Sequence, residues 1–300
     1  MTERAPMASG SSPWKTLFKL LLAGIGIASC FCCCGLGMVG RLADLDVRAP
    51  LPGFPTSVRI VDLGAVLLPP GTSPQDARNY EWKAQGISPP EHFVAYGLGP
   101  ELAGALEAQH TSFGRRLRYR SLGNERFTYN APAGCSADMR CIYEELMRTN
   151  AEPVQALGER FVASIRERGL DAAQATQLII GFVQRIRYEL PQDSPFGIVP
   201  PALVPAQDRG DCDSKALLAV MLLRQAGIDA VLLYSDPLAH AAVGVGLPGG
   251  SGTRLRHGGR SYQYAEVTAE GWPLGMIPPQ YDKPRLWKVL TLPGRGDTAG

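Results

Sequence analysis

The sequence lacks an excess of charge of either sign. Its 300 residues contain 30 lysines and arginines and 28 aspartates and glutamates, a formal net charge of +2. Nucleic-acid-binding proteins gather Lys and Arg on one face to neutralise phosphates. The densest basic run, "RRLRYR" at 115–120, alternates in the manner of a solvated strand that pairs with 126–130. The sequence therefore predicts no nucleic-acid partner.

Histidine is scarce, and repeats are absent. The chain has four histidines, and His92, His110 and His257 have no second ligand at metal-binding spacing. We expect surface or structural roles for these three. The sequence predicts no metal site and no cofactor.

One segment lacks charge altogether. Residues 20–40, "LLLAGIGIASCFCCCGLGMVG", are uncharged over 21 residues, and about 20 apolar residues cross a bilayer as a helix. The residues before this run are more basic than those after it, which orients a span with its preceding segment inside. The pattern predicts a cytoplasmic segment 1–19, a transmembrane anchor at 20–40, and an extracytoplasmic remainder, periplasmic or on the cell surface.

Two interpretations of this segment stay open. "IASC", ending at Cys30, resembles a bacterial lipoprotein cleavage box, which would make Cys30 the lipidated residue. The apolar run continues past Cys30, which favours an uncleaved anchor instead. Gly26, Cys30 and Cys34 are spaced four apart, a small-residue face that predicts weak helix-mediated self-association.

The cysteines outside that segment are Cys135, Cys141 and Cys212. In an oxidising compartment, "CSADMRC" closes a small disulfide loop between Cys135 and Cys141 more readily than it binds zinc, because no histidine is nearby. Cys212 is then the odd cysteine, and a thiol that persists in an exported domain calls for a chemical reason.

The chain divides by composition. Residues 41–57 are a proline-containing linker, 58–170 an N-terminal extension of mixed α/β character, 171–293 the main domain, and 294–300 a flexible tail. Helical periodicity is clearest in 139–150, 152–169 and 172–190, and Asp171 is a suitable N-cap for the last of these.

The sequence of the main domain predicts a central helix packed on a sheet. Asp211 is the natural N-cap of an apolar helix that begins at Cys212, and Gly227 ends it. Residues 229–235, 240–247 and 262–268 alternate as strands, the last two as a hairpin with a glycine-rich tip. A buried helix packed on an antiparallel sheet is an α+β architecture.

Three of its side chains suit nucleophilic catalysis. The helix N-terminus favours a thiolate at Cys212, although Asp211 and Asp213 oppose it. His240 begins the strand that returns to the helix mouth, and Glu266 on the next strand is placed to orient the imidazole. From the residues alone, a buried core cysteine and a structural histidine are the more common case, and that interpretation stays open.

The same residues resemble the transglutaminase-like cysteine-hydrolase superfamily. "GDCDSKALLAVMLLRQAGIDAVLL" is similar to its nucleophile block, "HAAVGV" to its histidine strand, and "YQYAEVTAEGWPLGMIP" to its acid strand, and the likeness covers 172–285. It implies a papain-like core, Cys212 as nucleophile, His240 as general base and acid, and Glu266 as orienting carboxylate. Many members have Asp in place of Glu266 and an aromatic residue in place of Ala241.

The resemblance also implies acyl transfer on a peptide or protein substrate, from the amide to water or to an amine. We expect the backbone N–H of Cys212 to hold the oxyanion, a second donor from Gln184 or Gln192, support from Asp211, and Trp272 in the substrate cleft.

Two rival functions remain open at this stage. One is a catalytically inactive domain that binds a peptide or protein partner of the cell envelope. The other is a structural envelope protein that oligomerises through residues 58–170.

Overall fold

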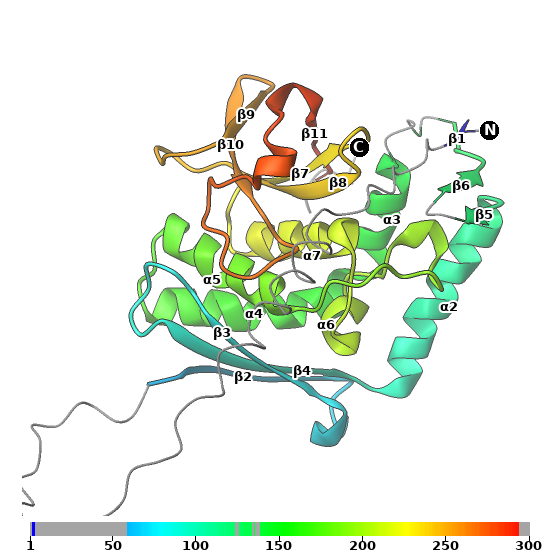
Figure 1. Ribbon diagram of the computed structural model, residues 1–300. Helices are drawn as coiled ribbons and strands as arrows, with labels where there is room; N and C mark the ends of the chain where they lie inside the picture. The colour runs from blue at the N-terminus through cyan, green and yellow to red at the C-terminus, as the bar shows by residue number, and fades with distance from the viewer. Residues whose placement is uncertain (1, 4–58, 124–125, 134, 136–138, 294–300) are drawn as a thin grey trace, which may run out of the picture. The chain divides into compact units, whose positions relative to one another are not determined.

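Helices and sheets alternate in layers in the computed structural model, which describes residues 2–3, 59–123, 126–133, 135 and 139–293 (Figure 1). A five-stranded sheet covers the central helix on one side, and two further helices separate that helix from a three-stranded sheet on the other. The architecture combines helices with mainly antiparallel sheets, which agrees with the predicted α+β class at this level. Within the described residues the helices are α2 (Pro100–Arg116), α3 (Arg140–Thr149), α4 (Ala151–Glu167), α5 (Ala172–Arg185), α6 (Leu203–Gln207) and α7 (Cys212–Gln225).

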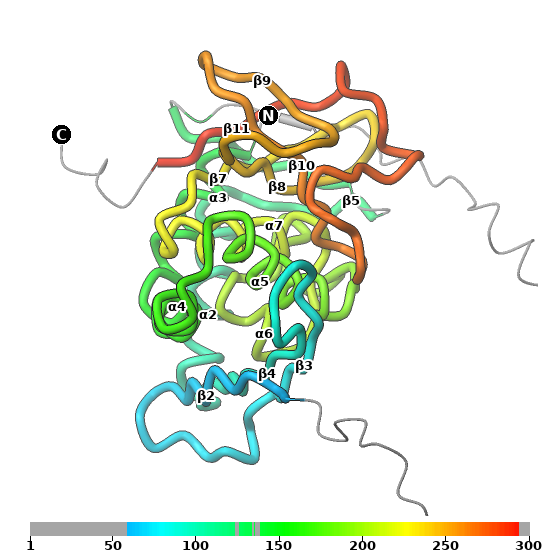
Figure 2. The backbone as a smooth tube through the Cα atoms, turned by 90° about the vertical axis from the view of Figure 1, so that its left-hand side faces the viewer, coloured from blue at the N-terminus to red at the C-terminus, as the bar shows by residue number. Residues whose placement is uncertain are grey.

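Helix α7 is the centre of the fold. It begins where expected, because the Asp211 side chain accepts a hydrogen bond from the Ser214 backbone N–H at 2.9 Å. It is followed by Gly227, whose φ of +77° is available to glycine without strain. Every residue from Cys212 to Leu223 is buried, because β7 and β8 cover one side of the helix and α4 and α5 the other. Figure 2 shows this packing from the side.

The five-stranded sheet is antiparallel and curled into a half-barrel, with the order β11-β7-β8-β10-β9. Its two edge strands come close to each other, which produces the curl. One face packs on α7, and the other encloses a second apolar cluster that includes Tyr264 and Trp287. The strands are β7 (Ala230–Ser235), β8 (His240–Val245), β9 (Arg254–His257), β10 (Arg260–Ala265) and β11 (Lys288–Leu290).

Residues before 171 share the main core. A three-stranded sheet of order β2-β4-β3 packs on α4 and α5, with β2 parallel to β4 and β3 antiparallel to it. A smaller sheet of order β1-β6-β5 joins β1, near the start of the chain, to β5 and β6, which lie between α2 and α3 in the sequence. The strands are β1 (Thr2–Glu3), β2 (Val61–Leu68), β3 (Arg78–Lys83), β4 (Glu91–Leu98), β5 (Arg120–Gly123) and β6 (Arg126–Tyr129).

Several local predictions need correction. Arg115 and Arg116 end helix α2, and the predicted strand begins only at Arg120. Helix α5 ends at Arg185 rather than near Pro191, because the following residues hydrogen-bond to the backbone of Gly210 instead. The glycine-rich tip predicted between β8 and β10 contains strand β9, and β11 has no counterpart in the sequence prediction.

The transmembrane helix predicted from the sequence is corrected. In the described part of the chain, no helix combines the length and the apolar character that crossing a bilayer requires. Residues 20–40 and Cys30 lie outside the described residues, as do 1, 4–58 and 294–300. The prediction depended on the absence of charge over that run, which is a signal of hydropathy and not of secondary structure.

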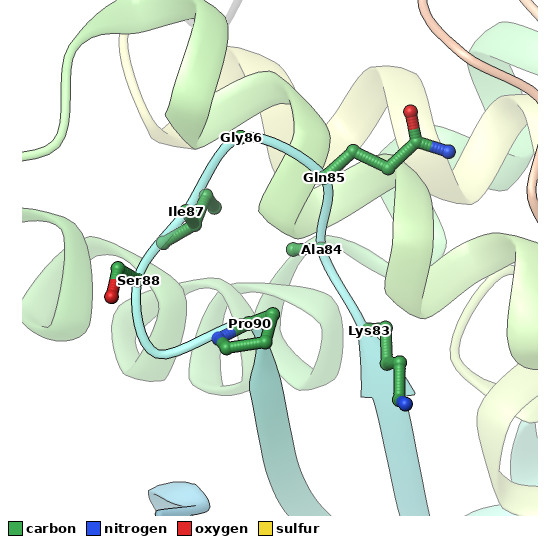
Figure 3. Close-up of a pocket in the computed structure, with 7 residues that line it drawn as sticks. All are labelled: Lys83, Ala84, Gln85, Gly86, Ile87, Ser88 and Pro90. Carbon is green, nitrogen blue, oxygen red and sulfur yellow. The ribbon is translucent and has the colours of Figure 1, made fainter.

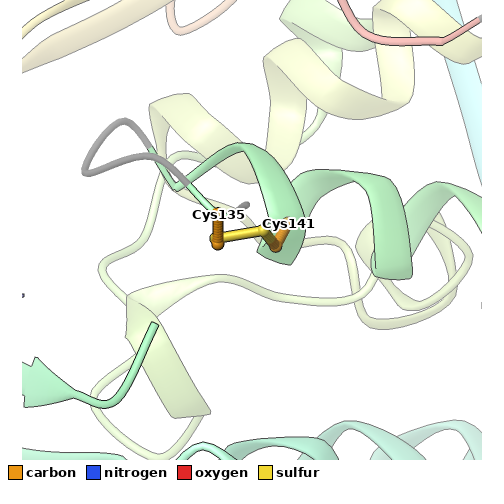
Figure 4. Close-up of a disulfide and its surroundings, with 2 residues drawn as sticks. All are labelled: Cys135 and Cys141. Carbon is orange, nitrogen blue, oxygen red and sulfur yellow. A yellow bond between two sulfur atoms is a disulfide. The ribbon is translucent and has the colours of Figure 1, made fainter. Parts of the chain in front are cut away.

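The predicted disulfide is confirmed. Cys135 and Cys141 are bonded with their Cα atoms 5.5 Å apart, and the bond ties the segment before α3 to the first turn of that helix (Figure 4). Cys212 lies elsewhere, at the start of α7, and is buried. The odd cysteine of the main domain is therefore a buried thiol in the described structure.

Candidate active site

Strands β8 and β10 bring His240 and Glu266 together. The strands are antiparallel with Ala265 opposite Val243, and one further step of this register puts Glu266 opposite Ala242. His240 and Glu266 are then diagonal neighbours on the same face, within reach of long side chains. His240 Nε2 lies 3.1 Å from Glu266 Oε2, and both side chains are almost completely buried. The histidine and the carboxylate predicted from the sequence therefore form a buried pair.

Among the described residues, five donors hold the Glu266 carboxylate. Oε2 accepts from His240 and from the Tyr264 hydroxyl at 2.7 Å, while Oε1 accepts from the Val267 N–H, the Thr268 N–H and the Thr268 hydroxyl. Burial acts to raise the pKa of Glu266, but the hydrogen bond and charge of His240, followed by the Thr268 bonds, lower that pKa to about 2. Glu266 is therefore an anion at neutral pH.

The His240 ring is fixed on several sides. The Tyr281 ring stacks on it with centroids 3.9 Å apart and planes 14° apart, and Trp287 meets it edge-on at 5.9 Å. Because Nε2 faces a carboxylate, the neutral ring carries its proton on Nε2 and leaves Nδ1 as the acceptor. Such an imidazole is oriented to receive a proton at Nδ1.

Cys212 occupies the first turn of α7 with its side chain buried. Its Sγ lies 3.8 Å from Asp213 Oδ2, and Asp213 Oδ1 accepts a hydrogen bond from Tyr143 at 2.6 Å. Asp211 accepts from both the backbone and the hydroxyl of Ser214. The two aspartates that flank the thiol are thus engaged in hydrogen bonds, and Asp211 supports the helix start as predicted.

The thiol lies in the same electrostatic cluster as the His240–Glu266 pair. Helix α7 packs on β8, the strand that His240 begins. Burial raises the pKa of the Tyr281 hydroxyl, and negative charges on Glu266 and Cys212 raise it further. Tyr281 stacks on His240. The geometry joins His240 directly to Glu266 and Tyr281, and the packing of α7 on β8 brings the helix that carries Cys212 against the strand that His240 begins.

The two glutamines proposed as oxyanion donors have other positions. Gln184 Nε2 donates to the backbone carbonyls of Glu266 and Trp272, at 2.9 and 3.0 Å, and its Oε1 accepts from the Gly271 N–H. Its amide clamps the loop that follows Glu266 and has no spare donor, which corrects the oxyanion assignment. Gln192 is exposed in the long loop before α6. Trp272 is half-buried, and its backbone carbonyl accepts a hydrogen bond from the Gln184 side chain.

Two surface cavities lie apart from these residues. One of about 410 Å³ is formed by residues 83–90, the loop between β3 and β4 (Figure 3). The other, about 140 Å³, lies between α2 and the loop around Pro195. Neither is lined by Cys212, His240 or Glu266, which are at most 6% exposed. All three side chains are therefore closed to solvent in this structure, and the Tyr281 ring covers one face of the His240 ring.

One group among the described residues has ligand types suited to a metal ion. The ligand atoms of Asp211, Cys212 and Asp213 lie within 4.8 Å of one another. Both carboxylates already accept hydrogen bonds from protein donors, and Asp211 is the N-cap of α7. The arrangement fits a helix start better than a coordination shell.

Sequence reasoning missed several residues of the site. Tyr264 and Thr268 are two residues on either side of Glu266, so strand alternation was sufficient to place all three on one face. Lys215 was visible as the one lysine in a largely apolar helix. Tyr281 gave no sequence signal, because its contact with His240 depends on the path of the loop after β10.

Comparison with protein-family models, with curated proteins and with solved structures finds no match for this chain. The chemistry of the site is therefore inferred from its own side chains.

Proposed function

We propose that this protein is a thiol-dependent acyl-transfer enzyme with a transglutaminase-like, papain-like core. Cys212 is the nucleophile, His240 the general base and acid, and Glu266 the orienting carboxylate. The observation that carries the proposal is the buried His240–Glu266 pair, with Nε2 on the carboxylate and Nδ1 turned to its other side. A base held by a third group beside a nucleophile is the arrangement that nucleophilic catalysis requires.

The reaction proceeds in two steps. Nδ1 of His240 removes the thiol proton, Sγ attacks an amide carbonyl carbon, and the C–N bond breaks as the imidazolium returns the proton to the leaving amine. This leaves a thioester on Cys212. Water or a second amine, deprotonated by the same imidazole, then attacks the thioester carbon and releases the thiolate, which recovers a proton. This step requires Sγ to lie within hydrogen-bonding reach of Nδ1 in the reactive conformation.

The substrate class is a peptide or protein amide. We expect the backbone N–H of Cys212, at the N-terminus of α7, to hold the oxyanion. The Cys135–Cys141 disulfide supports a site of action in an oxidising compartment outside the cytoplasm. Release to water gives a peptidase or amidase, and release to an amine gives a cross-linking enzyme.

A second candidate is a catalytically inactive domain of the same fold that binds a peptide or protein. The observation that favours it is the state of the thiol, which is 3% exposed and hydrogen-bonded to Asp213. An enzyme has to release this thiol on substrate binding, whereas a binding module does not.

Alkylation of the full chain with iodoacetamide separates the two. Trypsin cleavage after Arg209 and Lys215 isolates Cys212 in a six-residue peptide for mass spectrometry. The enzyme predicts labelling that is faster than that of an ordinary thiol at pH 6–7 and is slowed by His240→Gln. His257→Gln is the control, because His257 is exposed on β9. Labelling no faster than that of free cysteine, and indifferent to His240→Gln, excludes the proposed enzyme.

A further inference from the structure

Lys215 is a cation in the least exposed part of the molecule. It lies three residues after Cys212 on α7 and has no solvent-exposed surface. Its neighbours along the helix, Ser214 and Ala216, are also buried. An ammonium group without solvent is costly unless its N–H groups are used. The position of Lys215 therefore calls for a specific role.

Its hydrogen bonds are made to the end of another helix. Lys215 Nζ donates to the carbonyl of Ile186 at 2.5 Å and to that of Gln184 at 3.4 Å. Both residues belong to the C-terminal turn and cap of α5. The last carbonyls of a helix lack partners within the helix, and they lie at the negative end of its dipole. Lys215 thus caps α5 from α7.

The chain of contacts continues to the carboxylate of the proposed site. The Gln184 side chain donates to the carbonyl of Glu266 and to that of Trp272, and accepts from Gly271. One connected set of hydrogen bonds therefore runs from the helix that carries the nucleophile, through the end of α5, to the loop that carries Glu266. Among the described side chains, Lys215 is the member of this set that α7 contributes.

We propose that Lys215 is a positioning residue for acyl transfer: its ammonium fixes the α5 terminus so that Gln184 holds Glu266 against His240. This inference depends on the function proposed above and adds a residue that acts through Gln184 and not on the substrate. Loss of the ammonium loosens the Glu266 loop, so that the imidazole is no longer held in one orientation.

The charge on Lys215 is sensitive to pH. Burial lowers the pKa of Lys215 to about 8, and negative charges on Glu266, Asp208 and Glu270 oppose that lowering. Lys215 is therefore cationic at neutral pH and loses its charge as the pH passes about 8. The capping bonds to α5 weaken over the same range, because a neutral amine is a poorer donor.

The experiment measures Cys212 alkylation in the full chain from pH 6 to pH 9.5. Lys215→Met removes the ammonium, Gln184→Leu breaks the next connection, and the double variant tests whether they act in series. Arg224→Met is the matched control, because Arg224 also donates to two backbone carbonyls but at the other end of α7. Circular dichroism and thermal unfolding establish that each variant is folded.

We expect each single variant to slow labelling about tenfold at pH 7.5, the loss associated with one charge-assisted hydrogen bond. We expect the double variant to be no slower than the slower single variant, because both break one chain. The ratio of the wild-type rate to the Lys215→Met rate falls as the pH passes about 8, because wild-type Lys215 loses its own charge there. Should Lys215→Met not fold, Gln184→Leu with its own pH profile carries the test.

Three results overturn the inference: superimposable profiles for wild type and Lys215→Met, equal slowing by Arg224→Met, or multiplicative effects in the double variant. Failure of the proposed function is recognised separately. In that case the wild-type thiol itself reacts like free cysteine and His240→Gln changes nothing.

Discussion

Replacing Glu266 with glutamine tests the site at its most defined contact. The amide oxygen takes the place of Oε1 and keeps the bonds from Val267 and Thr268. The amide NH₂ then faces His240 Nε2, which carries a proton in the native arrangement. Two donors repel each other, so the imidazole moves its proton to Nδ1. We expect Glu266→Gln to leave the fold intact and remove the nitrogen that accepts the thiol proton.

The size of the effect follows from the carboxylate's environment. Lowering the Glu266 pKa to about 2 corresponds to about 3 kcal/mol of preference for the ionised form. His240 is the largest of the stabilising causes, and Thr268 supplies most of the remainder. The carboxylate is the negative charge that faces His240 Nε2, so we expect its loss to slow Cys212 labelling at least about tenfold.

The assay is the rate of Cys212 alkylation between pH 5 and pH 9. Glu266 remains ionised throughout this range, because its contribution to stability is lost only as the pH falls from about 4.5 toward 2. Changes of rate with pH therefore report the thiol, the imidazole and, near pH 8, Lys215. Tyr264→Phe is the control: it removes one neutral donor from Oε2 and keeps the charge. Equal rates for wild type and Glu266→Gln, or slowing by Tyr264→Phe as large as that by Glu266→Gln, refute the assignment of Glu266.

Two further predictions concern access and packing. Tyr281→Ala removes the ring stacked on His240, and we expect Cys212 to be alkylated several-fold faster; an unchanged rate shows that Tyr281 does not limit access. A Cβ at Gly244 would lie 2.8 Å from Val231 Cγ2 and 3.0 Å from a Leu233 side-chain carbon, so Gly244→Ala lowers the free energy of unfolding by about 1–3 kcal/mol. Urea titration measures this loss, and an unaltered midpoint contradicts the packing argument.

Elements with strong local signals were predictable from the sequence. Helix α7 is specified by the Asp211 cap, the apolar run and Gly227, and the structure has it at Cys212–Gln225. Helix α5 begins at the predicted cap, where Asp171 and Gln174 form a reciprocal capping box. Each of these signals lies within one or two turns of the helix end that it determines. The capping hydrogen bonds join residues that are close in sequence, so they form without help from the rest of the fold.

Features that depend on distant parts of the chain were not predictable. The end of α5 at Arg185 is set by pairing with Gly210, 25 residues later, and by the Lys215 cap. Gln184 looked like a free amide because its partners, Glu266 and Trp272, lie more than 80 residues away. A single sequence shows the polarity of each residue and the periodicity of its apolar residues. It does not show the partner of a buried polar group, because that partner depends on how the layers pack.

The composition of the Glu266 site argues for chemistry over structural support. A buried ion pair is a weak source of stability, because desolvation of both charges offsets their attraction. A glutamine at position 266 would satisfy the Val267 and Thr268 donors as well as the carboxylate does. What only the carboxylate provides is negative charge against His240 Nε2, which fixes the tautomer and stabilises imidazolium. Packing in a protein core does not require a fixed histidine tautomer or a stabilised imidazolium. A general base that accepts and returns a proton requires both.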